Sequence, residues 1–189
     1  MWRHIQRDSD GKTIDLDNAL AESYDTRCNG VVSIPISENK INKGYIFSAT
    51  KLFTGITDAS SVEMIGITGD NPARLLTLVK ASGEMEIEYE KGTTFTDKGT
   101  SVTSVNRNET SDNTSGVNIY HTPTIDTSGT VFAEDLIPGG GQKNASIGGE
   151  SSMDFRYVVE SNSTHLLRVT NSSGADQKIF IKFIWTEKS

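Results

Sequence analysis

The sequence predicts an all-β fold, a jelly-roll β-sandwich of about eight antiparallel strands preceded by an extended N-terminal arm. Three observations support this prediction. Short apolar runs recur roughly every 8–14 residues, and turns rich in Gly, Ser, Thr and Asn separate them. A helical period is almost absent. Hydrophobic residues make up 34% of the chain and aromatic residues 7%, which is typical of many short strands rather than of a compact enzyme.

The first part of the chain differs from the rest. Residues 1–42 are charged and have no regular hydrophobic period, so we divide the chain into an N-terminal arm, residues 1–42, and a sandwich domain, residues 43–189. Within the arm we expect a short helix over residues 16–23 and an extended segment over residues 31–36. Pro35 restricts that segment to an edge strand or an arm, because proline cannot donate a hydrogen bond to a neighbouring strand.

Apolar runs then predict strands in residues 45–53, 61–68, 74–81 and 84–90, with a hairpin at residues 82–83. In the last of these strands Met85, Ile87 and Tyr89 alternate with four glutamates, so we expect the apolar side chains to point inward and the carboxylates outward. Stacked carboxylates repel each other. The simplest expectation is a solvated acidic face; Lys or Arg on neighbouring strands, or a cation, are the alternatives.

The next part of the chain predicts further strands in residues 101–106, 116–121, 130–137 and 154–160. A polar turn is expected at residues 93–100. Residues 110–116 are too polar to bury and are expected to form an exposed loop. A second, glycine-rich loop is expected over residues 138–149.

The end of the chain predicts a β-hairpin that closes the sandwich. Residues 166–170 and 178–187 are its expected arms, and residues 171–174 supply turn-forming Asn, Ser and Gly. In the second arm four apolar residues share one face at period two, and burying each is expected to contribute roughly 1.5–3 kcal/mol. These residues are Ile179, Ile181, Phe183 and Trp185.

The opposite face of that arm carries Phe180, Lys182 and Ile184. It is more apolar than a fully solvated face. We therefore expect the N-terminal segment or another subunit to cover it.

Composition excludes several partners. The formal net charge is -7 and the isoelectric point is near 5.0, which argues against nucleic acid and anionic membranes because both need clustered Lys and Arg. Cys28 is the only cysteine, so no disulfide framework is expected. No signal-peptide run or transmembrane stretch is recognisable, and we expect folding in a reducing cytoplasm.

No catalytic or metal-binding motif is recognisable. The triplet at residues 11–13 lacks the glycine and the preceding strand of a phosphate-binding loop. His4, His121 and His165 are scattered, and no acid–base or nucleophile constellation accompanies them. We therefore expect a protein that is not an enzyme and that uses no cofactor and no metal.

Three stretches in order resemble the virion structural proteins of tailed bacteriophages. They are residues 106–108 after a turn at 99–100, residues 129–132 with 137–140, and residues 166–174 followed by 183–187. The similarity covers about residues 80–189. The resemblance implies a jelly-roll module on the phage particle, often a trimeric capsid decoration or cement protein. It implies a homotrimer and the phage major capsid protein as partners, and a location on the head surface after synthesis in the bacterial host cytoplasm.

Five residues are the predicted interface. Val31, Ile34 and Ile36 belong to the arm, which is expected to become ordered against a capsid or a neighbouring subunit, and Phe180 and Ile184 belong to the outer face of the last strand. The alternative is a tail-associated receptor-binding or carbohydrate-binding jelly-roll module. That alternative predicts exposed aromatic residues around a concave surface or on the loops at residues 110–116 and 138–149.

Overall fold

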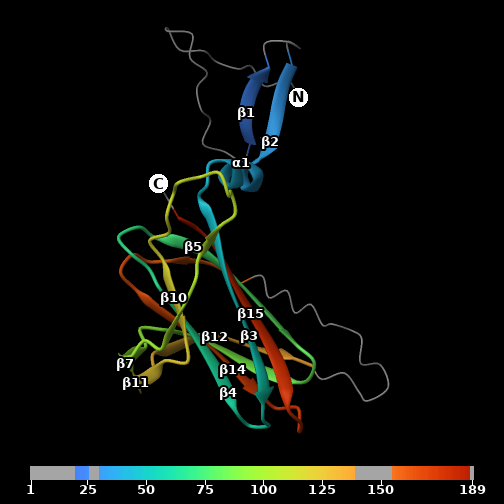
Figure 1. Ribbon diagram of the computed structural model, residues 1–189, viewed down its shortest axis with the longest axis vertical. Coiled ribbons are helices and arrows are strands. Elements are labelled where there is room, and N and C mark those ends of the chain that lie inside the picture. The colour runs from blue at the N-terminus through green and yellow to red at the C-terminus, as the bar shows by residue number, and fades with distance from the viewer. Residues whose placement is uncertain (1–19, 26–29, 139–154, 188–189) are drawn as a thin grey trace. The chain divides into compact units, whose positions relative to one another are not determined.

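The computed structural model describes residues 20–25, 30–138 and 155–187 (Figure 1). Contacts divide the chain into two compact units, Met1–Lys43 and Gly44–Ser189, and each is described by itself. Among the described residues, no helix is long and apolar enough to cross a membrane.

The first unit contains a β-hairpin and a short helix. Strand β1 (Leu20–Asp25) pairs antiparallel with β2 (Gly30–Pro35), and helix α1 (Ile36–Asn42) follows directly. The extended segment expected at 31–36 is confirmed up to Pro35, which ends the strand. The helix expected over residues 16–23 is wrong for its described part, because residues 20–23 pair with β2; residues 16–19 lie outside the described residues.

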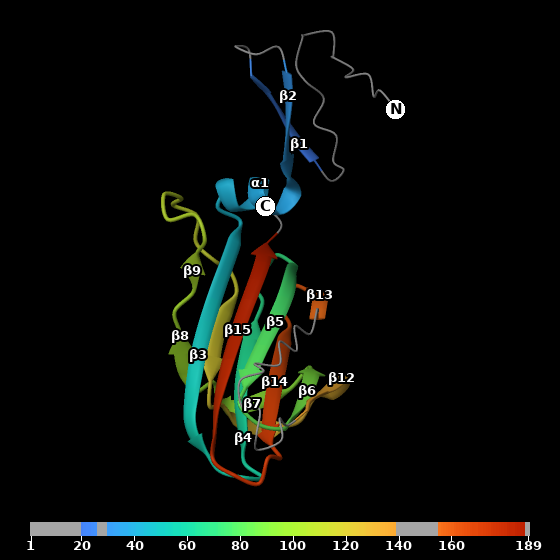
Figure 2. The same cartoon turned by 90° about the vertical axis from the view of Figure 1, so that its right-hand side faces the viewer.

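The second unit is a sandwich of two antiparallel sheets, with a small two-stranded sheet beside them. In order, the six-stranded sheet contains β12 (Thr130–Ile137), β6 (Met85–Lys91), β14 (Thr164–Asn171), β4 (Ser61–Ile67), β10 (Asn118–His121) and β8 (Thr100–Val102). The five-stranded sheet contains β13 (Phe155–Val159), β5 (Ala73–Ala81), β15 (Gln177–Glu187), β3 (Ile46–Ile56) and β9 (Val105–Asn106). Strands β7 (Thr94–Asp97) and β11 (Thr124–Thr127) form the small sheet. Figure 2 shows β3, β15 and β5 side by side.

The strand pairing is nested. Strand β3 pairs with β15, β4 with β14, β5 with β13 and β6 with β12, and these four pairs alternate between the two sheets. The ribbon continues inward as β7 with β11 and β8 with β10. One long antiparallel ribbon, folded across two layers, is the jelly-roll arrangement. The predicted all-β jelly-roll sandwich is therefore confirmed.

Two predicted hairpins are wrong. Strands β14 and β15 lie in opposite sheets, so the segment between them crosses the sandwich instead of turning within one sheet. The Asn171 side chain fixes this crossing, because its Nδ2 donates to the carbonyl oxygens of Ile56 and Ala175 at 2.9 and 2.8 Å. Residues 82–83 likewise join β5 and β6, which belong to different sheets.

The strand expected over residues 101–106 is also divided. Its first part ends β8 and its last part forms β9, and these strands belong to different sheets. The polar turn expected at 93–100 contains β7 and the start of β8. The loop expected at 110–116 has no strand, as predicted.

The core lies between the two large sheets. All four apolar residues predicted on the inner face of β15 are at most 1% exposed: Ile179, Ile181, Phe183 and Trp185. The inward residues predicted in β6 are equally buried: Met85, Ile87 and Tyr89. The Glu187 carboxylate at the end of β15 accepts hydrogen bonds from Ser115 Oγ at 2.6 Å, Gly116 N at 2.9 Å and Trp185 Nε1 at 3.0 Å. This carboxylate therefore fastens the 107–117 loop to the last strand.

Candidate functional site

The outer face of the five-stranded sheet carries an apolar strip. On β15, Phe180 and Ile184 point away from the core and are half-buried. Phe180 lies opposite Leu52 of β3, and Ile184 lies opposite Leu76 of β5. We define the outer strip by six residues: Leu52, Leu76, Leu78, Val158, Phe180 and Ile184.

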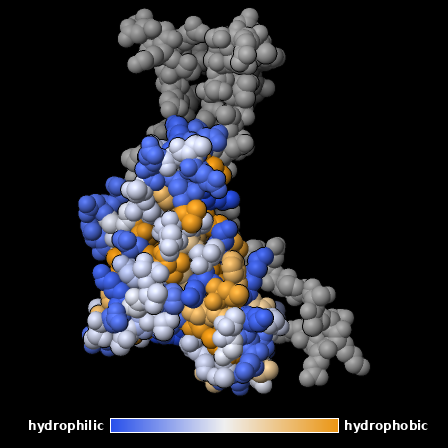
Figure 3. Space-filling view, in the orientation of Figure 1, coloured by the Kyte–Doolittle hydropathy of each residue, from blue (hydrophilic) through white to orange (hydrophobic). Residues whose placement is uncertain are grey.

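Two members of the outer strip are strongly exposed, since Leu52 is 54% and Val158 68% accessible. Figure 3 shows hydrophobic residues gathered at the surface along β15. A sheet face that is exposed to water on one side normally alternates to polar residues. The outer strip departs from that pattern, so it is the candidate interaction surface.

The outer face of the six-stranded sheet has a different chemistry, centred on Arg168. The Arg168 guanidinium contacts Glu63 at 2.9 Å, Glu88 at 3.0 Å and also Glu90, whose side chain is only 1% exposed. Burial alone would lower the pKa of Arg168. Hydrogen bonds to Glu63 and Glu88 and the charge of Glu90 outweigh burial and raise this pKa.

The four glutamates predicted to point outward from residues 84–90 therefore divide into two pairs. Glu84 and Glu86 are exposed, as expected for a solvated face. Glu88 and Glu90 instead pair with an arginine of the neighbouring strand β14, the alternative considered above. Glu90 also accepts hydrogen bonds from Thr93 Oγ1 at 2.8 Å and Gly129 N at 2.9 Å.

An aromatic cluster joins the two sheets around His165. The Tyr89 ring stacks on Tyr157 at 5.6 Å and on His165 at 6.1 Å, and the Phe132 ring meets Tyr89 edge-on at 4.8 Å between centroids. Ser163 Oγ donates to the Glu160 carbonyl oxygen at 2.7 Å, so at 3.0 Å it accepts from His165 Nε2–H. His165 Nδ1 is buried and has no hydrogen-bond partner within the described residues.

His165 is expected to make the folded state sensitive to acid. Burial, and secondarily the charge of Lys91, lower the pKa of His165 from 6.5 to about 4, against the opposing charge of Glu160. The unfolded chain therefore binds a proton more readily, and stability is lost as pH falls from about 6.5 to about 4, by at most about 3 kcal/mol. Denaturant unfolding at pH 7 and pH 4 measures this loss.

Two variants isolate the contribution of His165. In His165→Gln the difference in unfolding free energy between the two pH values should shrink. His121→Gln should shrink it less, because burial and the charge of Lys51 also lower the pKa of His121, but His121 lies at a more exposed strand end. Equal pH dependence in wild type and His165→Gln would contradict the assignment.

A shallow groove of about 360 Å³ lies at the other edge of the sandwich, along β8, β9, β10 and the 107–117 loop. Its polar lining is uncharged: Ser101, Thr103, Ser104, Asn106, Asn113, Thr114, Ser115 and Asn118. Among the described residues of the lining, Phe47 alone is aromatic; it is 3% exposed and stacks on Trp185. The groove therefore offers hydrogen bonds but no exposed ring on which a sugar can stack.

The structure places the predicted site residues unevenly. Phe180 and Ile184 lie together in the outer strip. Val31 and Ile34 belong to β2 and Ile36 begins α1, in the separate N-terminal unit. His4, residues 11–13, Cys28 and most of the glycine-rich loop lie outside the described residues.

Sequence reasoning missed the remaining members of the outer strip and the role of Arg168. The sequence of β5 did indicate part of the outer strip. Its outward residues Leu76 and Leu78 alternate with buried Leu75, Thr77 and Val79, and a strand that is apolar on both sides needs cover on both faces. Within the described part of the chain, no group of three or more His, Cys, Asp or Glu residues is arranged to hold a metal ion.

Comparisons with known proteins add little. No family model and no curated protein matches the chain. Among solved structures it is similar to a chain of the structure described as "KBV activated particle at acidic pH", with 15% identity and a TM-score of 0.16. The alignment covers 90% of this chain and 57% of that one, so the chain spans little more than half of that chain's length. At this TM-score the similarity supports no conclusion about fold or function.

Proposed function

We propose that the protein is a structural component of a tailed-bacteriophage virion, a capsid decoration or cement protein that binds the head surface as a homotrimer. The observation that carries the proposal is the outer strip. Its six apolar residues lie on four neighbouring strands, β3, β15, β5 and β13, and include two that are more than half exposed. Contiguous apolar surface of this kind is typical of interaction sites on folded proteins.

The architecture suits this role. The sandwich is held by a continuous apolar core, with one cysteine in the whole chain, so it needs no oxidising compartment to fold. A net charge of -7 keeps such a protein soluble before it meets a repetitive surface. The jelly-roll order of the strands agrees with the resemblance of residues 80–189 to phage virion proteins.

The predicted arm residues remain part of the proposal. Val31, Ile34 and Ile36 are proposed to contact the capsid or a neighbouring subunit, together with Phe180 and Ile184 of the outer strip. Tail-associated or carbohydrate-binding function is the weaker alternative. The polar groove favours this alternative. However, Phe47 is buried, so it offers no exposed ring in the groove on which a sugar could stack.

The test measures abundance and binding. In purified particles, quantitative mass spectrometry should find this chain at a stoichiometry comparable to that of the major capsid protein, and recombinant protein should bind heads that lack it. Phe180→Asp with Ile184→Asp should abolish this binding, because charge in the outer strip cannot be buried without a partner, whether the strip contacts the head or joins the copies of the trimer that binds it.

The matched control is Val105→Asp, an equally apolar residue that is 55% exposed and lies on β9, outside the outer strip. It should bind heads as the wild type does. A stoichiometry of only a few copies per particle would place the protein on the tail and contradict the decoration role.

A further inference from the structure

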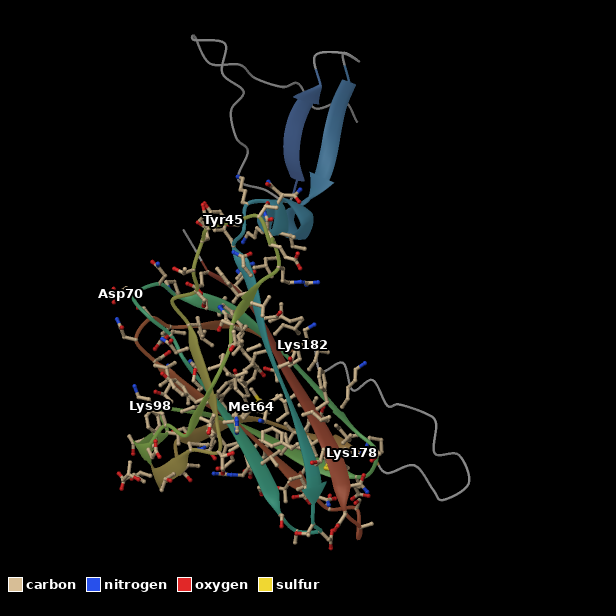
Figure 4. The ribbon with its side chains drawn as sticks, viewed as in Figure 1. Tyr45, Met64, Asp70, Lys98, Lys178 and Lys182 are labelled. Atoms are coloured by element: carbon tan, nitrogen blue, oxygen red, sulfur yellow. The ribbon has the colours of Figure 1, made fainter. Side chains whose placement is uncertain are left out.

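The two outer faces of the sandwich carry opposite charge. On the five-stranded sheet, the outward positions of β3, β5 and β15 hold four cations and no Asp or Glu: Arg74, Lys80, Lys178 and Lys182. These cations flank the outer strip, and Figure 4 labels Lys178 and Lys182 along β15, with Met64 in the core. Arg74, Lys178 and Lys182 form no ion pair with another described residue. We call this surface the basic face.

The six-stranded sheet presents the opposite charge. The outward positions of β4, β6, β12 and β14 hold five glutamates and one cation, Arg168: the glutamates are Glu63, Glu86, Glu88, Glu90 and Glu134. Arg168 pairs with Glu63, Glu88 and Glu90, and five carboxylates with one guanidinium give this surface a net charge of -4. Leu136 lies among these glutamates, opposite Glu86, and is 51% exposed. We call this surface the acidic face.

This segregation is not what a net charge of -7 alone would produce. An acidic chain with charges spread for solubility would place carboxylates on both faces. Here one face combines an apolar strip with four cations, and the other combines an exposed leucine with a net charge of -4. The two faces are therefore complementary in charge, and each has apolar surface to bury.

We propose that the basic face docks onto the acidic face of a second copy of this chain. The inference rests on the proposed function in that it names the surfaces through which copies of the decoration protein meet. Because the two patches differ, the contact is heterologous: every copy uses its basic face toward one neighbour and its acidic face toward another. Such contacts close into a ring when the rotation between neighbouring copies is a whole fraction of a full turn, and otherwise they extend into an open chain.

The electrostatic part of the contact predicts two properties of the association. Association should weaken as ionic strength rises, because exposed charges farther apart than about 8 Å are screened at physiological salt. Like charges facing each other should oppose association. Removing the net charge of either face alone should therefore prevent the contact, although the fold is untouched.

The test uses two charge-reversed full-length variants. Lys178→Glu with Lys182→Glu brings the net charge of the basic face from +4 to zero, and Glu86→Lys with Glu134→Lys brings that of the acidic face from -4 to zero. None of the four residues contributes to the Arg168 cluster or the core. Each variant alone should be monomeric by sedimentation equilibrium at a concentration where the wild type associates. Their equimolar mixture should associate again, since each supplies the face that the other lost.

The control is Asp70→Lys with Asp112→Lys, which makes the same change in net charge as Glu86→Lys with Glu134→Lys, but at an exposed turn and an exposed loop outside both faces. It should associate like the wild type. Failure of the mixture to recover association, or a wild type that stays monomeric at low salt, would overturn the inference. A trimer and an open chain in solution would support the contact equally. The number of copies in purified particles does not depend on the association measured in solution. The proposed function and this inference can therefore fail separately.

Discussion

Trp185→Ala is expected to lower the free energy of unfolding by about 3–5 kcal/mol, the range for emptying a buried aromatic site. Trp185 is 1% exposed, and its ring stacks on Phe47 at 6.1 Å between centroids. Its Nε1 also donates to Ser115 Oγ at 3.1 Å and to Glu187. The substitution therefore leaves a cavity and loosens the 107–117 loop from β15. Chemical denaturation followed by circular dichroism measures the loss.

A milder variant separates packing from hydrogen bonding. Trp185→Phe keeps a ring against Phe47 but removes the N–H donor, and should cost about 1–3 kcal/mol. The control, Val105→Ala, changes a side chain that is 55% exposed and should stay within about 0.5 kcal/mol of the wild type. A Trp185→Ala protein as stable as Val105→Ala would show that the space between the sheets near Trp185 is not tightly packed.

Arg168→Met is expected to cost about 3–5 kcal/mol, because it leaves the buried Glu90 carboxylate without its cation. Glu90 is 1% exposed, and the hydrogen bonds from Thr93 and Gly129 do not neutralise its charge. The loss is due to an unpaired charge, so adding Glu90→Gln to Arg168→Met should restore part of the stability. Unfolding free energies of wild type, both single variants and the double variant complete the cycle.

An exposed ion pair in the same unit provides the comparison. Lys91 Nζ lies 2.8 Å from the Glu160 carboxylate, and the side chains are 46% and 73% exposed. Lys91→Met should leave stability close to that of the wild type, because solvent screens such pairs. If the double variant were no more stable than Arg168→Met, the arginine would act mainly by packing its side chain over the sheet.

Local pattern predicted several strands well. In β6, alternation of three apolar residues with glutamates identified Met85, Ile87 and Tyr89 as core, and the same argument identified the inner face of β15. Period-two alternation is a property of the strand itself, so it can be recognised before the strand has a partner. It also revealed that the face with Phe180 and Ile184 is unusually apolar.

Turn chemistry was a less reliable guide. The Asn-Ser-Ser-Gly segment at the end of β14 and the Ser-Gly pair after β5 predict hairpin turns, yet both segments cross between sheets. A short polar connection has the same composition whether the chain returns beside the preceding strand or passes to the opposite layer. Which of the two paths the chain takes depends on the distant strands with which the next strand can pair. Strand β15 pairs with β3 on one side and with β5 on the other.

The sequence by itself determined the all-β class, the approximate strand positions and which side of most strands is apolar, because these follow from residue spacing along a few neighbouring positions. Only the tertiary structure decided that β3 pairs with β15 and β4 with β14, that Glu90 is buried against Arg168, and that cations and carboxylates gather on opposite faces. Each of these facts joins residues far apart in the chain. Their proximity results from folding the whole ribbon into two layers, and no local pattern encodes it.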